Sequence, residues 1–291
     1  MSARGAILVL AAAACLCAQA CGGRAATRQS ASSTAAPTPT PHAPTFPALQ
    51  RGTAGFVPFV NLGAGRRFEA REVGRKPRRE DLEVSADYPV LLGDEGPAAR
   101  EFNRLARALV LEDVTPYLEA RPDHEKRRDR HFKDVKESHH VSHQVVFASD
   151  EFVSVLFYVT GYSWGAAHGY HRPVAFNFDL KAGREIKLAG LFRPGSAYLQ
   201  TLSTLCDEDL RRQFGPRYMA GKGGLFADGL RPKAGNFDSW VVTRDGLVFV
   251  FEEYRVASYA DGEPKVLIPF EALREIADPR GPLARLAAER P

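Results

Sequence analysis

The alternation of hydrophobic and polar residues predicts strands and helices from residue 82 onward. Period-two or β-branched runs predict strands at residues 82–93, 144–149, 153–159, 174–179, 239–243, 247–251 and 264–269. Apolar residues at helical spacing predict amphipathic helices at residues 97–118 and 197–214. We therefore expect an α+β fold, in which an antiparallel β-sheet of several hairpins is flanked by the two amphipathic helices.

Turn residues indicate which strands form hairpins. Ser149-Asp150-Glu151 separates the strands at 144–149 and 153–159, and Asp245-Gly246 separates those at 239–243 and 247–251. A glycine-rich turn follows residue 159 and leads into the strand at 174–179. This central hairpin is expected to lie in the middle of the sheet.

The turn of the central hairpin also carries the candidate ligand-binding residues. Polar and aromatic side chains gather there, namely Tyr162, Trp164, His168, Tyr170 and His171. Tyrosine and tryptophan offer rigid contact area at low entropic cost, and they dominate binding hot spots. The alternative interpretation is that these rings cap the core of the sheet.

A serine-hydrolase motif in this turn lacks its structural context. Residues 161–165 fit the pattern G-x-S-x-G, but that motif must open a helix, and a second turn and a strand follow here. The last histidine of the chain is His171, too close to Ser163 to complete a triad of that kind. The sequence therefore predicts no catalytic serine.

Histidines raise the question of a metal site. In a strand, His139 and His143 face the same side, so they could share a zinc ion with His168 or His171. No Asp, Glu or Cys stands at a recognisable ligand spacing, so we favour a polar strand end facing solvent. The sequence predicts no metal and no cofactor.

Composition adds little chemistry of its own. The formal net charge is +4, with 44% hydrophobic and 25% charged residues, which is typical of an ordinary globular protein and does not indicate nucleic-acid binding. The arginine-rich stretch at residues 66–79 is predicted to be a solvated basic loop rather than an anion site.

The N-terminal residues predict export and anchoring. Residues 1–20 read as a signal peptide ending before Cys21, and the whole arrangement resembles a bacterial lipoprotein signal. Residues 21–49 would then be a lipidated cysteine and a Pro/Ser/Thr/Ala-rich tether, holding the protein to a membrane in the cell envelope on the extracytoplasmic side. The alternative is ordinary secretion. Cys206 would remain as a lone thiol, buried at helical spacing with leucines.

Several segments together resemble a known family. The turn GAAHGYHRPVAFNFDLKAGREIKLAGLF and the stretch FDSWVVTRDGLVFVFEEYRVASYADGEPKVLIPFEAL are similar to segments of the anti-sigma-V factor (RsiV) and peptidoglycan-deacetylase accessory-domain group. The segment LEVSADYP with the FNRLA helix resembles the companion N-terminal module. The resemblance implies a DUF4163-like module at residues 50–194 and a DUF3298/RsiV-like module at residues 195–291. Ala166 stands where the family usually has a second glycine.

The resemblance also implies a function. It points to a non-enzymatic binding module on a lipid tether that recognises lysozyme or cell-wall glycan, because the regulatory relatives bind lysozyme. One alternative is a metal-dependent hydrolase of envelope polymers using the four histidines named above. A second alternative is a structural envelope lipoprotein without a soluble ligand.

Overall fold

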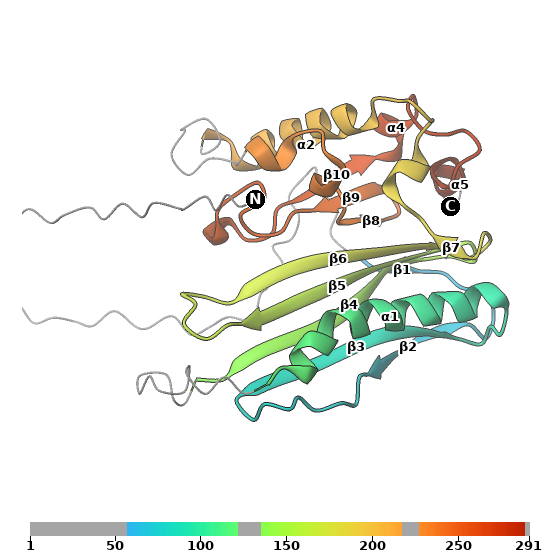
Figure 1. The fold of residues 1–291 in the computed structure, drawn as a ribbon. Coiled ribbons are helices and arrows are strands. Elements are labelled where there is room, and N and C mark those ends of the chain that lie inside the picture. The colour runs from blue at the N-terminus through green and yellow to red at the C-terminus, as the bar shows by residue number, and fades with distance from the viewer. Residues whose placement is uncertain (1–56, 122–134, 217–226, 289–291) are drawn as a thin grey trace, which may run out of the picture. The chain divides into compact units, whose positions relative to one another are not determined.

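The computed structural model describes residues 57–121, 135–216 and 227–288. Within these residues a helix, a large sheet, a small sheet and a second helix follow one another as four layers (Figure 1). The predicted α+β fold with a largely antiparallel sheet is confirmed. The helices and strands are β1 (Phe59–Val60), β2 (Arg67–Glu72), β3 (Leu82–Leu92), α1 (Pro97–Glu119), β4 (Glu137–Ala148), β5 (Phe152–Tyr162), β6 (Tyr170–Asp179), β7 (Arg184–Glu185), α2 (Tyr198–Phe214), β8 (Trp240–Val242), β9 (Gly246–Val250), β10 (Lys265–Pro269), α4 (Phe270–Leu273) and α5 (Pro282–Ala288).

Part of the N-terminal prediction falls outside this description. The signal peptide at residues 1–20, the lipidated Cys21 and the tether at residues 21–49 lie outside the described residues and stay predictions, as does the module boundary at residue 194. Along the described ranges, no helix combines the length and the apolar character needed to cross a membrane.

The large sheet has seven strands, in the order β2-β3-β4-β5-β6-β7 with β1 beside β4. The pairs β2–β3, β4–β5, β5–β6 and β6–β7 are antiparallel. However, β4 runs parallel to β3 and to β1. The prediction of one antiparallel sheet of hairpins was therefore too simple. Helix α1 connects β3 to β4, and a helical crossover lets two neighbouring strands run in the same direction.

One face of the large sheet is covered by α1. Val155 and Phe157 of β5 point to this face and are 0% exposed. Phe102 of α1 stacks on Phe176 of β6 with 5.5 Å between ring centroids and meets Phe178 edge-on at 5.7 Å. Because side chains of a strand alternate between its two faces, the odd-numbered residues of β5 and the even-numbered residues of β6 face α1.

The opposite face of the large sheet packs on the small sheet, whose order is β10-β9-β8. Ser154 of β5 accepts a hydrogen bond from Val242 N (2.9 Å) and donates one to Asn177 Oδ1 (2.6 Å). Asn177 in turn donates to Trp240 O (2.7 Å). These buried bonds fix β8 against β5 and β6, because breaking any of them would leave a buried polar group unpaired.

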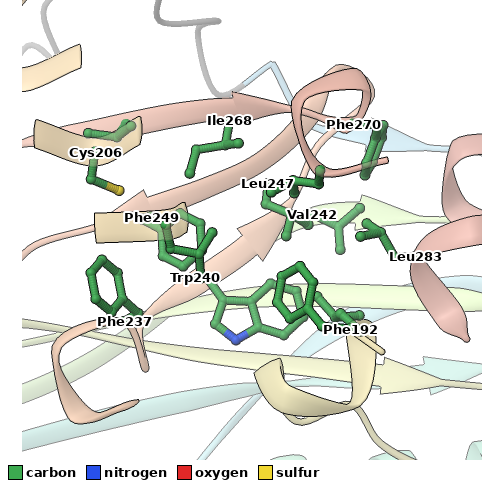
Figure 2. Close-up of a cluster of buried hydrophobic side chains, with 14 of the residues drawn as sticks. Phe192, Cys206, Phe237, Trp240, Val242, Leu247, Phe249, Ile268, Phe270 and Leu283 are labelled. Carbon is green, nitrogen blue, oxygen red and sulfur yellow. The ribbon is translucent and has the colours of Figure 1, made fainter. Parts of the chain in front are cut away.

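Helix α2 covers the far side of the small sheet. Figure 2 shows Cys206 of α2 in the apolar cluster that also contains Trp240, Phe249 and Ile268. Cys206 is 0% exposed, and this burial raises the pKa of its thiol well above the usual value. The prediction that Cys206 is a buried small residue is confirmed, as is the β8–β9 hairpin at Asp245-Gly246.

Candidate ligand-binding surface

The five predicted site residues of the turn between β5 and β6 lie in three different places. His168 and His171 meet the loop that follows β9. Tyr170 lies on the α1 face of β6 and contacts residues of α1 and β4. Tyr162 and Trp164 lie beside the beginning of β4. The predicted site is therefore not one surface.

The histidine side of the turn forms an aromatic surface with two tyrosines of the β9–β10 loop. The imidazole of His168 stacks on the ring of Tyr259, with 3.7 Å between centroids and 26° between planes. His168 Nε2 shares a hydrogen bond of 2.9 Å with the hydroxyl of Tyr254, whose ring centroid lies 6.2 Å from that of Tyr259. We call His168, His171, Glu253, Tyr254 and Tyr259 the aromatic surface.

Tyr254 is held in a strained backbone conformation. Its φ angle is 63°, and among the described residues it is the one non-glycine residue with positive φ. A left-handed conformation costs a non-glycine residue roughly 1–3 kcal/mol. The Tyr254 side chain is 54% exposed, so packing in the core does not offset this cost. Strain of this kind gathers at functional sites, because the surrounding structure maintains it for a reason other than stability.

Carboxylates line the aromatic surface. His171 Nδ1 lies 2.7 Å from Glu253 Oε1, and the Glu253 side chain is only 10% exposed. Burial raises the pKa of the Tyr259 hydroxyl, and the charge of Glu253 raises it further. Burial also raises the pKa of Glu263, while Lys265 and His171 oppose that shift. The surface thus combines flat apolar ring faces with several hydrogen-bonding groups at their edges.

His139 corrects one of the sequence predictions. It was expected at a solvated strand end, but it is 1% exposed and lies under α1. Its Nδ1 lies 2.7 Å from the Tyr170 hydroxyl and its Nε2 lies 2.7 Å from Asp113 Oδ1. The ring of Tyr117 stacks on it at 3.6 Å. The prediction failed because α1 supplies Asp113 and Tyr117, and no local pattern around residue 139 reveals them.

Asp113 completes this buried network. Burial alone would raise the pKa of Asp113, but hydrogen bonds from His139 and Arg172 outweigh it and hold the pKa below its usual range. Arg172 reaches the carboxylate from β6, the strand that also carries Tyr170. The network therefore ties the beginning of β6 to both α1 and β4.

Gly161 makes room for the network. His139, Gly161 and Tyr170 lie side by side in one row across β4, β5 and β6. A Cβ at Gly161 would lie 2.4 Å from the Tyr170 hydroxyl, so any side chain there would displace it. The absent side chain lets the Tyr170 ring cross β5 and reach His139.

Tyr162 and Trp164 lie in other surroundings. The Tyr162 hydroxyl donates to Ala166 O (3.1 Å), and the backbone N–H of Trp164 donates to Glu137 Oε1 (3.0 Å). Glu137 also pairs with Arg79, whose side chain is only 11% exposed. The expectation of a solvated basic loop at 66–79 is thus wrong for Arg79.

The four histidines of the metal hypothesis do not converge on one point. His139 contacts Asp113, His143 contacts Asp87, His168 contacts Tyr254 and His171 contacts Glu253. Across the described ranges, no group of three or more His, Cys, Asp or Glu residues could hold a metal ion.

Sequence reasoning missed the β9–β10 half of the surface. Glu253, Tyr254 and Tyr259 were not chosen as site residues, although they belong to the motif segment YRVASYADG and its neighbour that carried the family resemblance. Two motifs that resemble the same family lie more than 80 positions apart, and the structure brings them into contact. Because both motifs resemble the same family, the sequence could have indicated that they form one site.

Comparison with known proteins gives partial matches. The family described as "Protein of unknown function (DUF3298)" matches residues 189–271. Peptidoglycan-N-acetylmuramic acid deacetylase PdaC of Bacillus subtilis (strain 168) is 26% identical over 151 residues, which cover 50% of this chain and 32% of that protein. This chain therefore spans about a third of that relative's length.

Two solved structures align with most of this chain. A DUF3298 family member from Bacteroides fragilis NCTC 9343 has a TM-score of 0.56 at 15% identity, over 77% of this chain and 98% of that one. A DUF3298 family protein from Pseudomonas aeruginosa PAO1 has a TM-score of 0.47 at 17% identity, over 74% of this chain and 93% of that one. Residues 189–271 of this chain match the DUF3298 family model, and these residues include α2 and the whole small sheet, together with Tyr254 and Tyr259.

Proposed function

We propose that this chain is a binding module without catalytic activity of its own, and that its aromatic surface holds cell-wall glycan. The observation that carries the proposal is the stacked pair His168–Tyr259 beside the strained and exposed Tyr254. The similarity to PdaC, whose name describes an enzyme acting on peptidoglycan N-acetylmuramic acid, supports a role at the cell wall.

The chemistry of the surface suits a sugar ring. The face of a pyranose is made of C–H groups, which pack on aromatic faces by dispersion and by burial of apolar area. Its rim is made of hydroxyls, which donate to carboxylates such as Glu253 and accept from tyrosine hydroxyls. His171 fixes the Glu253 carboxylate at 2.7 Å, so that this acceptor is pre-oriented before a ligand arrives.

The test is co-sedimentation of the purified full chain with insoluble peptidoglycan. Tyr254→Ala should weaken binding by roughly 2 kcal/mol, about thirtyfold, as expected for a hot-spot aromatic. Tyr162→Ala is the matched control, because it removes a tyrosine of the neighbouring turn that hydrogen-bonds to Ala166 and lies outside the aromatic surface. Equal binding by wild type and Tyr254→Ala would show that the glycan site lies elsewhere.

Lysozyme is the second candidate ligand, since the family resemblance implies it and protein interfaces favour exposed tyrosines. Binding to immobilised lysozyme in the absence of peptidoglycan, and competition by soluble chitin oligomers in the sedimentation assay, separate the two ligands. Binding to lysozyme without competition by the oligomers favours a protein ligand, and competition by the oligomers favours a glycan ligand. If the chain binds neither peptidoglycan nor lysozyme, the structural-lipoprotein alternative gains support. Anchoring through Cys21 and location in the cell envelope belong to the same proposal.

A further inference from the structure

Among the residues that the structure describes, most of strand β6 has no neighbouring strand on its outer side. β5 pairs with the whole of β6, from Tyr170 to Asp179. On the other side β7 pairs only with Phe178 and Asp179, and Ile186 N donates to Asn177 O at 2.8 Å. From Tyr170 to Phe176, no strand among the described residues continues the sheet. A row of backbone groups is therefore left at this edge.

The register shows which backbone groups these are. The β5–β6 ladder has no register shift, so successive residues of β6 direct their N–H and C=O groups to opposite sides. Asn177 directs its carbonyl away from β5. His171, Pro173 and Ala175 share its parity and direct their backbone groups to the same side. The free edge thus offers two N–H groups and three C=O groups, because proline has no N–H.

This edge opens into a groove rather than onto a flat surface. A cavity of about 540 Å³ runs beside Arg172, Pro173, Val174 and Ala175. A second cavity of about 340 Å³ adjoins it, since both are lined by Ala175, Glu185, Lys187 and Asp238. The opposite wall comes from the segment before β8 and the end of β9, including Ser239 and Phe251.

Two polar groups in the groove have no partner in the described part of the chain. Asp238 has no hydrogen bond or ion pair within the described part of the chain, whereas Lys187, Arg172 and Arg255 each pair with a carboxylate. The hydroxyl oxygen of Ser239 is buried and has no hydrogen-bond partner among the same residues. The groove therefore carries one unmatched negative charge and one unmatched hydroxyl next to the unpaired backbone edge.

We propose that this groove binds an extended segment of a partner protein that adds a strand to β6 and places a basic side chain near Asp238. The distance from His171 to Ala175 is about 14 Å along a strand, which suits roughly five residues of an extended peptide. Strand addition supplies main-chain hydrogen bonds, and Asp238 selects for a cation. Pro173 interrupts the row of donors, which limits pairing to a short segment and hinders open-ended self-association.

The proposal does not rest on glycan binding, because it uses the backbone edge of β6 and not the aromatic side chains. Its test uses a phage-displayed library of random heptapeptides, selected on the full chain and counter-selected on Ala175→Pro. That variant removes an outward N–H of the edge, and an edge strand tolerates proline. Selected peptides should carry Lys or Arg and should bind the wild type at least roughly tenfold more tightly than the variant.

Chemical variants of the selected peptide make the test independent of protein folding. N-methylation of the amides that face β6 should reduce its affinity roughly tenfold, whereas N-methylation of the alternate amides should be tolerated. Asp238→Asn should weaken binding and reduce its salt dependence, and Pro173→Ala should strengthen it by restoring a donor. Failure to enrich peptides on the wild type, or affinities insensitive to N-methylation, would overturn the proposal. Dimerisation of the chain that Ala175→Pro abolishes would also overturn it, because the edge would then belong to a second copy.

Discussion

Replacing Gly161 with alanine adds a methyl group where two other groups already lie. The new Cβ would be 2.3 Å from the carbonyl oxygen of Ser138 and 2.4 Å from the hydroxyl of Tyr170. The first belongs to the backbone of β4, which pairs with β5 at this point. The second lies 2.7 Å from His139 Nδ1. The substitution therefore has to displace the β4–β5 ladder, the Tyr170 ring, or both.

The expected loss of stability has two parts. Moving the Tyr170 hydroxyl leaves a nitrogen of His139 without a partner at a site that is 1% exposed, which costs about 1–3 kcal/mol. Crowding a packed region adds about 1–3 kcal/mol. Together Gly161→Ala should lower the free energy of unfolding by about 2–6 kcal/mol. Tyr170→Phe, which only leaves the same His139 nitrogen without a partner, should lower it by about 1–3 kcal/mol.

Urea unfolding of the full chain, followed by tryptophan fluorescence, measures these differences. Gly74→Ala is the matched control, since a Cβ there meets nothing within 4 Å, and it should change stability by less than about 0.5 kcal/mol. In a Tyr170→Ala background, Gly161→Ala should cost less than in the wild type, because the ring it crowds is gone. A Gly161→Ala variant as stable as the wild type, or strict additivity with Tyr170→Ala, would refute the packing argument.

Three further predictions concern single side chains. The hydrogen bonds of Asp113 with His139 and Arg172 stabilise the fold above the pKa that Asp113 has in the unfolded chain. This stabilisation is lost as the pH falls through the lowered pKa that Asp113 has in the folded state. Below about pH 4, the wild type should therefore lose stability more steeply than Asp113→Asn in acid titrations of unfolding. Cys206→Ser should cost about 1–3 kcal/mol in urea unfolding, because it buries a hydroxyl at a 0% exposed site, while reductant should leave the wild-type midpoint unchanged. Cys21→Ser should move the protein from the membrane to the soluble fraction, and persistent sedimentation with membranes in high salt would contradict lipid anchoring.

The sequence predicted the elements well because most of them carry a complete local signal. Alternation and turn residues placed the β4–β5 and β8–β9 hairpins, and helical spacing placed α1 and α2 within one residue at each end. The division into two sheets was also present in the sequence but was not used. The segment Phe152–Phe157 is buried throughout, as its nearly continuous apolar run indicates for a strand covered on both faces.

The candidate site was predicted less completely for a physical reason. The aromatic surface consists of a turn and a loop that meet because the two sheets pack on each other, through shared apolar clusters and the buried bonds of Ser154 and Asn177. No periodicity records such a contact. The positive φ of Tyr254 is likewise imposed by tertiary structure, since tyrosine does not favour that conformation by itself.

Strand β6 connects the buried network, the aromatic surface and the groove, because its two side-chain faces and its outer backbone edge each meet one of them. The side chains of Tyr170 and Arg172 face α1 and hold the strand in place. His171 faces the opposite way and contacts Glu253 of the aromatic surface. The outward backbone groups of Ala175 and its neighbours line the groove. Because side chains of a strand alternate and its backbone groups point sideways, changes on one side leave the other two directions intact. Tyr170→Phe should therefore reduce stability, Tyr254→Ala glycan binding, and Ala175→Pro peptide binding, each without the other two effects.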